Sequence, residues 1–434
     1  MDTDIPPSWT ASAQAGGTVS NDWLKSFQDP RLDAIVHQAI ARNLDLRQAA
    51  DRVEAARQIV GVVGSRLKPQ IGGNFGANTL RAKDQDSNFN SNREIVSVSW
   101  ELDVWGRLRA QRAAAQAGYQ ATALDYAYAR QSLAATSVKA WYQAIATRRL
   151  LAINEQAVRV YKELLRLATV KQAAGQVAQL DVAEAGAKVY EAESQLRETQ
   201  SLLSEEQRAL EVLIGNYPAA ALDVNQDLPP PPPAIAAGLP STLLERRPDL
   251  VAAERLVLAA FRTHEAARLA FLPTFTLSAD GGRLYDEALS VLRSNPWFYL
   301  ADIGMKVPFY TGGALRAELK ISDAHQQRAL AAYGSAVLNA FREVENALTN
   351  ENLYGQRLKF EEDALRERTE AVRLATIKYQ NGAIDLLPVL QLQTDALAVE
   401  SEAIRLRNAV LANRINLHLA LGGSFDSAPA ATVK

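Results

Sequence analysis

The sequence contains two copies of one unit. Residues 167–182, LATVKQAAGQVAQLDV, return as residues 374–389, LATIKYQNGAIDLLPV, after a shift of 207, with seven of sixteen positions identical. The same shift relates Gly215 to Gly422, and a shift of 204 relates Pro69 to Pro273. A chain of two matched units with a nearly constant register must fold as two similar halves of one interlocked body.

Long helices dominate each copy. Helical periodicity runs without proline over residues 106–175, and residues 313–382 repeat it. A helix of about 69 residues is a rod of about 100 Å, which cannot be buried in one globule and must pack along other helices. After each glycine turn a shorter helix returns, over residues 180–213 and 386–421. Each returning helix is about half as long as its rod. The helices before the two β-hairpins, residues 32–66 and 243–271, can supply the other half, and we call them the lead-in helices.

Two segments with a period of two interrupt each copy. Residues 71–77 and 95–102 alternate apolar and polar side chains, as do residues 274–282 and 297–307. Strands of about ten residues are long enough to cross a bilayer when tilted. Taken alone, so short an alternation favours a small soluble sheet with aromatic residues in its core. Aromatic residues near the strand ends are candidates for a membrane interface: Trp100, Trp105, Trp297, Phe298, Tyr299, Phe309 and Tyr310.

These patterns divide the chain in order. The predicted parts are an extended arm (1–28), a lead-in helix (29–68), a β-hairpin (69–105), a helical hairpin (106–215), a proline-rich linker (216–242), a second lead-in helix (243–272), a second β-hairpin (273–311), a second helical hairpin (312–422) and a tail (423–434).

Composition excludes several classes of function. The net charge of -2 leaves no basic excess for nucleic acid, and no run of about 18 apolar residues predicts a transmembrane helix. Cysteine is absent, and the four histidines stand apart from one another: His37, His264, His325 and His418. No phosphate loop, catalytic motif or metal-ligand spacing is present. The sequence therefore predicts neither an enzyme nor a cofactor or metal site.

The strands restrict the architecture. Four membrane-length strands cannot sit alone in lipid, because the edges of their sheet would stay unpaired. If these are membrane strands, several chains must close the barrel, and closure would bundle the long helices into a tube. A tube joined to a membrane barrel predicts conduction.

The chain closely resembles the TolC-like outer-membrane efflux factor family, in its NodT-type branch. The resemblance is carried by WLKSFQDPRLDAIVHQAIARNLDLRQAADRVEAAR, PSTLLERRPDLVAAERLVLAA, GALRAELK, AFREVENAL, AGQVAQLDV and NGAIDLLPV, in this order. It implies a mainly α-helical homotrimer: a barrel in the outer membrane closed by three protomers with four strands each, a long α-helical barrel through the periplasm, and an equatorial belt. It also implies a periplasmic adaptor and an inner-membrane pump, commonly of the resistance-nodulation-division class, as partners.

In the family, the helical turns form the periplasmic tip, where acidic rings or polar links close the tube. The positions six and nine residues after each turn glycine are Asp181, Glu184, Pro388 and Gln391, which are the candidate pore gate. Asp181 fits a helix cap equally well. The candidate adaptor contact is the turns themselves, namely Gly175, Gln176, Val177, Gly382, Ala383 and Ile384.

Two alternatives remain at this point. A soluble periplasmic coiled-coil adaptor or scaffold also has long helical hairpins, although such adaptors lack a full-length tandem repeat. The same duct could instead serve metal ions or a secreted polypeptide. Because the chain has only two methionines, Met1 and Met305, soft-metal transport is less favoured than export of organic compounds.

Overall fold

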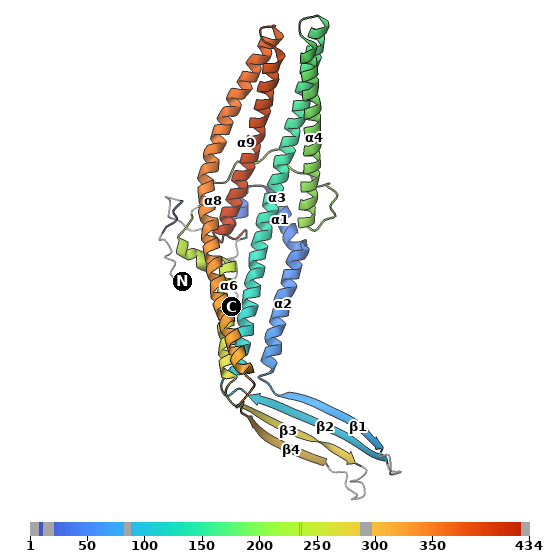
Figure 1. Ribbon diagram of the computed structural model, residues 1–434, viewed down its shortest axis with the longest axis vertical. Helices are drawn as coiled ribbons and strands as arrows, with labels where there is room; N and C mark the ends of the chain where they lie inside the picture. Colours follow the sequence, from blue (N-terminus) through green and yellow to red (C-terminus); the bar gives the residue numbers. More distant parts are fainter. Residues whose placement is uncertain are drawn as a thin grey trace.

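The computed structural model describes residues 8–11, 21–81, 88–233, 235, 237–286 and 297–426. Two helical hairpins stand side by side at one end, and a four-stranded sheet lies at the other end (Figure 1). The predicted fold, mainly helical with a tandem repeat and a small β part, is confirmed. In the described part of the chain, no helix is both long enough and apolar enough to span a membrane.

The helical hairpins are matched element by element. The rods α3 (Arg107–Ala173) and α8 (Ala314–Gln380) have 67 residues each. The returning helices α4 (Gln179–Leu213) and α9 (Leu386–Ala420) have 35 residues each. Each rod packs against its returning helix, and α3 also contacts α9, so the two hairpins are held together along their length.

Each lead-in segment is divided, where the sequence pattern predicted one continuous helix. The first copy has α1 (Pro30–Arg42) and α2 (Leu44–Ser65), and the second has α5 (Leu243–Arg246) and α6 (Pro248–Leu269), after short turns of η1 (Trp23–Phe27) and η2 (Pro240–Thr242). Asn43 leaves the helical conformation at ψ 125° and caps α2 by accepting from the Leu46 N–H. Arg247 leaves it at ψ 116°, because the following Pro248 disfavours a helical residue before it.

The divisions form two equivalent joints. Asn43 Nδ2 donates to the carbonyl of Leu213 at the end of α4, at 3.1 Å. Arg247 Nη1 donates to the carbonyl of Ala420 at the end of α9, at 3.4 Å. We call these the first and second helix joints. At each joint a returning helix ends directly above the lead-in helix that continues its line beside the rod (Figure 1).

A glycine closes each joint. Gly215 and Gly422 have φ values of 73° and 70°, the left-handed conformation that ends many helices. A Cβ atom on Gly215 would lie 2.8 Å from the Cβ of Arg42, and one on Gly422 would lie 3.0 Å from the carbonyl oxygen of Arg246. Only glycine fits both the backbone conformation and the space.

The sheet combines both copies. Its strands β1 (Gln70–Arg81), β2 (Asn88–Leu102), β3 (Thr274–Asp286) and β4 (Trp297–Lys306) are antiparallel in the order β1-β2-β3-β4. In the central pair, Val98 of β2 lies opposite Ala279 of β3. The helices next to the sheet follow the same order, since α2 packs on α3, α3 on α6 and α6 on α8. Strands β1 and β4 are left at the edges.

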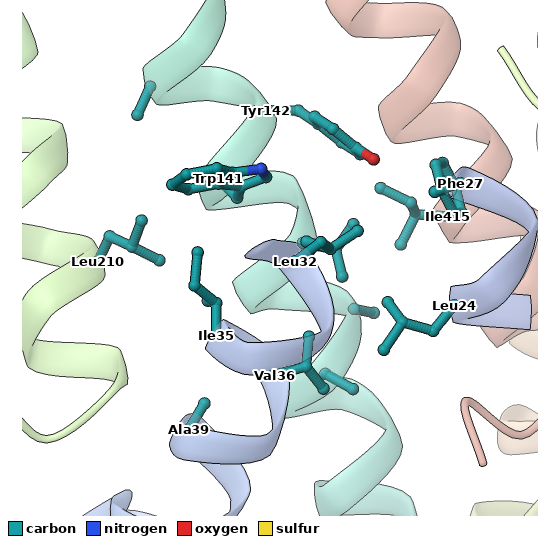
Figure 2. Close-up of a cluster of buried hydrophobic side chains, with 14 of the residues drawn as sticks. Leu24, Phe27, Leu32, Ile35, Val36, Ala39, Trp141, Tyr142, Leu210 and Ile415 are labelled. Carbon is teal, nitrogen blue, oxygen red and sulfur yellow. The ribbon is translucent and has the colours of Figure 1, made fainter. Parts of the chain in front are cut away.

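The main core lies at mid-height, where both copies and the N-terminal arm meet (Figure 2). Leu32, Ile35 and Val36 of α1 pack against Trp141 and Tyr142 of α3. Leu210 of α4 joins from one side, and Ile415 of α9 joins from the opposite side together with Leu24 and Phe27 of the arm. These side chains are almost fully buried. The proline-rich linker is held nearby by Arg414, which donates to the carbonyls of Pro232 and Pro233.

The joint glycine gives a testable prediction. Gly215→Ala places a methyl group against Arg42 and strains the backbone, so we expect a loss of about 1–3 kcal/mol of stability. Thermal unfolding of the purified protein should show a lower midpoint. Gly118→Ala is the control, because a Cβ on Gly118 of α3 meets nothing within 4 Å, and it should leave the midpoint unchanged or slightly raised. Equal midpoints for the two variants would contradict the conclusion that the first helix joint requires glycine at position 215.

Candidate functional site

Two tight turns form the end of the molecule farthest from the sheet (Figure 1). Gly175 and Gly382 have φ values of 71° and 73°. The N–H of Gln176 donates to the carbonyl of Lys171 at 2.9 Å, and the N–H of Ala383 donates to that of Lys378 at 2.8 Å. This is the pattern by which a left-handed glycine closes a helix end. Of the six predicted contact residues, only Val177 and Ile384 are half-buried, and the other four are exposed.

Asp181 lies at the base of the first turn. Its Oδ2 accepts from the N–H of Ala178 at 3.1 Å, so it caps α4. The side chain is half-buried, and its negative charge also reaches Tyr379 of the other hairpin. Burial, and to a smaller extent the charge of Asp181, raises the pKa of Tyr379. Asp181 therefore caps its own helix and acts electrostatically on the neighbouring hairpin.

The other three predicted gate residues are exposed. Glu184 lies one helical turn beyond Asp181 on α4. Pro388 takes the position of Asp181 in the second copy, and Gln391 takes that of Glu184. Gln391 Nε2 donates to Asp395 Oδ1 at 3.0 Å, and Asp395 also pairs with Arg368 at 3.1 Å. Among the described residues of one chain, no hydrogen bond or ion pair joins Asp181 or Glu184 to Pro388 or Gln391.

A link between the two hairpins was missed by sequence reasoning. Lys171 Nζ of α3 donates to the carbonyl of Tyr379 of α8 at 2.5 Å and lies 4.1 Å from the centre of its ring. Tyr379 is buried together with Ala168 and Leu386 in a cluster that contains residues of both hairpins. One signal was available, because Tyr379 replaces Gln172 within the repeated turn sequence.

The sheet has one apolar face. Residues directly opposite each other on antiparallel strands point to the same side, so the register defines each face. Phe75 and Ile303 on this face are 76% and 74% exposed, although they are large and apolar. The apolar side chains that share the face are Ile71, Phe75, Val96, Val98, Trp100, Leu102, Phe275, Leu277, Ala279, Trp297, Tyr299, Ala301, Ile303 and Met305. Its charged exceptions are Glu94 and Arg283, which lie opposite each other, with Arg283 over the ring of Trp297.

The opposite face of the sheet is mainly polar. Ser99 lies opposite Gln70 and Ser278, and Ser278 lies opposite Asp302. Ile95, Phe298 and Leu300 are the larger apolar exceptions. The remaining polar members with described side chains are Asn74, Arg93, Ser97, Glu101, Thr274, Thr276, Asp280 and Lys306. A sheet with one exposed apolar face and one polar face can separate lipid from water.

The predicted interface aromatics lie at two levels. Trp297, Phe298 and Tyr299 begin β4, at the end of the sheet away from the helices. The other four lie toward the helices: Trp100 is near the end of β2, and Trp105, Phe309 and Tyr310 are in the connections between the strands and the rods. Trp105 Nε1 donates to the carbonyl of Pro273 at 2.7 Å, which fixes that ring where the sheet meets the helices.

No metal site is apparent in the described residues, where no three side chains of His, Asp or Glu are grouped to hold an ion. Three of the histidines have contacts within the described residues, and His37 Nδ1 lies 2.7 Å from the carbonyl oxygen of Asp33. His418 is buried and stacks on Trp23 at 5.5 Å between ring centres, and burial lowers its pKa to about 3. His264 Nδ1 lies 3.1 Å from the hydroxyl of Ser322.

Comparison with known proteins is consistent over almost the whole chain. The sequence model of one family, described as outer membrane efflux protein, matches residues 35–216 and 239–423. The pyoverdine export outer membrane protein OpmQ of Pseudomonas aeruginosa is 30% identical over 442 residues, covering 97% of this chain and 92% of that protein. The toluene efflux pump outer membrane protein TtgF of Pseudomonas putida is 30% identical over 414 residues, covering 94% of this chain and 86% of that protein. The solved outer-membrane channel OprN superposes with a TM-score of 0.86 at 26% identity, covering 98% of this chain and 99% of the OprN chain.

The link between the hairpins gives a second prediction. Lys171→Met removes the cation over Tyr379 and its hydrogen bond, a contact worth about 0.5–2 kcal/mol. Amide hydrogen exchange in both turns should therefore become about 2- to 30-fold faster. Lys378→Met is the control, because Lys378 is the repeat counterpart of Lys171 and is exposed. Equal exchange in the two variants would show that the link does not hold the turns.

Proposed function

Because the chain belongs to the outer membrane efflux protein family, we propose that three copies of it form one passive exit duct of an efflux pump. The protein is an outer-membrane component of such a pump. In the proposal, the duct conducts small organic compounds from the periplasm to the outside, hydrolyses nothing and needs no cofactor. The observation that carries this proposal is the sheet, with its exposed apolar face, its polar face and its two unpaired edges.

The edges of the sheet support a trimer. One chain leaves the outer edges of β1 and β4 unpaired, and unpaired backbone groups in lipid cost several kcal/mol each. Pairing β4 of one copy with β1 of the next removes these edges and brings α8 beside the next α2. Two copies would give eight strands, whose interior is filled by side chains, whereas three copies give twelve and leave room for a channel.

The two faces set the orientation of the sheet. The apolar face of the sheet turns outward to outer-membrane lipid, and the polar face lines the channel. The aromatic residues at the two levels then lie at the two membrane interfaces. The helical hairpins extend from the inner interface into the periplasm, where their turns form the tip.

The partners and cargo follow from the family. A periplasmic adaptor meets the tip, and an inner-membrane pump of the resistance-nodulation-division class supplies the driving force. Two matched relatives are named for pyoverdine and toluene, which are organic compounds, and this favours such cargo over metal ions or polypeptides. Family membership removes the alternative of a soluble adaptor or scaffold.

The gate is proposed at the tip. Glu184 is exposed beside the half-buried Asp181, and three copies would place three of each around the opening. The link from Lys171 to Tyr379 holds the two hairpins of each copy together just inside this ring. Opening then requires the hairpins to separate, while the carboxylates attract cations to the constriction.

Planar-bilayer recordings test the duct and its gate together. The purified protein should be a trimer by native mass spectrometry and should form discrete channels. Asp181→Ala with Glu184→Ala should raise the single-channel conductance and lower the preference for cations, because the ring of carboxylates is lost. Glu205→Ala is the control, since Glu205 is an exposed carboxylate of α4 far from the turn. Monomers without channels would refute the duct, and unchanged conductance and selectivity would refute the gate.

The adaptor contact has its own test. A Cβ on Gly175 or Gly382 meets nothing within 4 Å, so a large side chain there would project outward, at a cost of about 1–2 kcal/mol of backbone strain at each left-handed position. Gly175→Trp with Gly382→Trp should abolish drug resistance in cells while trimers still assemble. Gly175→Ala with Gly382→Ala is the control, because alanine brings the same strain in the left-handed conformation but adds only a methyl group. Full resistance in the tryptophan variant would place the adaptor elsewhere.

A further inference from the structure

Two adjoining pockets form one trough where the helices approach the sheet. The first, of about 550 Å³, lies among α2, α3, α6 and α8. The second, of about 400 Å³, continues along α6 and α8. Both are lined by Thr263 and His325, so they join. We call the pair the seam trough, because it follows the line of contact between α6 and α8.

The seam trough opens on the side of the polar face of the sheet. Arg107 lines the trough, and its Nη2 lies 2.6 Å from Glu101 Oε1. Glu101 lies opposite Thr276, and both belong to the polar face. A larger groove of about 1030 Å³, around Leu258 and Phe261, lies on the other side of α6. In the proposed duct the seam trough therefore faces the lumen, and the larger groove does not.

The floor of the trough is apolar and built from small side chains. Alanines from three helices leave the space open, because each side chain fills only the volume of one methyl group. They are Ala114, Ala253, Ala259, Ala260, Ala266, Ala267, Ala270, Ala329 and Ala332. Leu256, Ile321 and Tyr333 add larger apolar surface. The combined space is in the range of pockets that hold drug-sized molecules.

The charged groups around this floor are mostly cations. Arg66, Arg107 and Arg328 line the trough, and Glu318 is the one carboxylate that lines it. Arg107 is neutralised by Glu101, whereas Arg66 and Arg328 form no ion pair with any described residue. Two exposed guanidinium groups without an ion-pair partner stand beside an apolar floor. They attract an anion, because a guanidinium is always charged and only weakly hydrated.

We propose that the seam trough binds amphipathic organic anions inside the duct. The apolar part of such a molecule lies on the alanine floor, and its anionic group lies toward Arg66 or Arg328. An apolar cation of the same shape meets the same floor but is repelled by these groups. The inference rests on the proposed duct, since cargo reaches this site only if the trough faces the lumen.

Two probes with one fluorophore and opposite charges test the inference. Dansylglycine is an anion and dansylcadaverine is a cation, and both brighten in an apolar site. Titrated into the purified trimer in detergent, dansylglycine should bind at least about tenfold more tightly than dansylcadaverine. Arg66→Gln with Arg328→Gln should weaken dansylglycine by about tenfold or more and remove the difference between the probes. Ala329→Trp should weaken both probes, because it fills the trough without changing its charge.

Arg262→Gln is the matched control, because Arg262 lines the larger groove on the other side of α6 and pairs with Glu265. It should leave the binding of both probes unchanged. Equal binding of the two probes to the wild type overturns the inference, as does binding that survives both trough variants. If the trimer conducts in bilayers but does not prefer the anion, the proposed anion site in the trough is wrong and the proposed duct is not affected. A protein that does not conduct overturns the duct and with it the trough.

Discussion

The arrangement of this molecule depends on the need to pair the backbone N–H and C=O groups at the two edges of its sheet. In a sheet of four strands, β1 and β4 each have one edge without a partner strand. The backbone N–H and C=O groups along these edges have no hydrogen-bond partners in lipid. Because the chain carries its helices in the order of its strands, the arrangement that closes the sheet in the proposed trimer also closes the helices into a tube. In this proposal the membrane part and the periplasmic part assemble through one operation, and neither can close without the other.

The duplication solves a second problem, which is how to flank a rod of 67 residues on both sides along its whole length. A returning helix of 35 residues is too short, so a lead-in helix of 22 residues continues its line. The helix joints make this possible. At each of them one side chain reaches the last carbonyl of the returning helix, while a glycine allows the two chain segments to approach. The rods stay unbroken because the breaks occur in their neighbours.

Local signals in the sequence predicted what depends on local structure. The helix lengths, the alternating strands and the glycine turns follow from periodicity and from residues with special backbone preferences. The break at Asn43 was missed because it lies in a strongly helical stretch and depends on Leu213, far away in the chain. Arg247 could have been found, since it precedes Pro248. The tip was located from Gly175 and Gly382, but the contact of Lys171 with Tyr379 spans 208 residues and has no local pattern. The register between β2 and β3 could not be predicted either, because these strands are also far apart in the chain.

The unequal turns have a consequence for stoichiometry. Tyr379 stands in one turn where Gln172 stands in the other, and Asp181 where the other has Pro388, although the backbones of the two turns are closed in the same way. Around the proposed trimer, the backbone thus repeats six times and the side chains three times. A partner that grips only the backbone encounters six equal places, whereas a partner that recognises side chains encounters three of each kind. The number of partner subunits that the tip accepts is accordingly set by which of these two surfaces they contact.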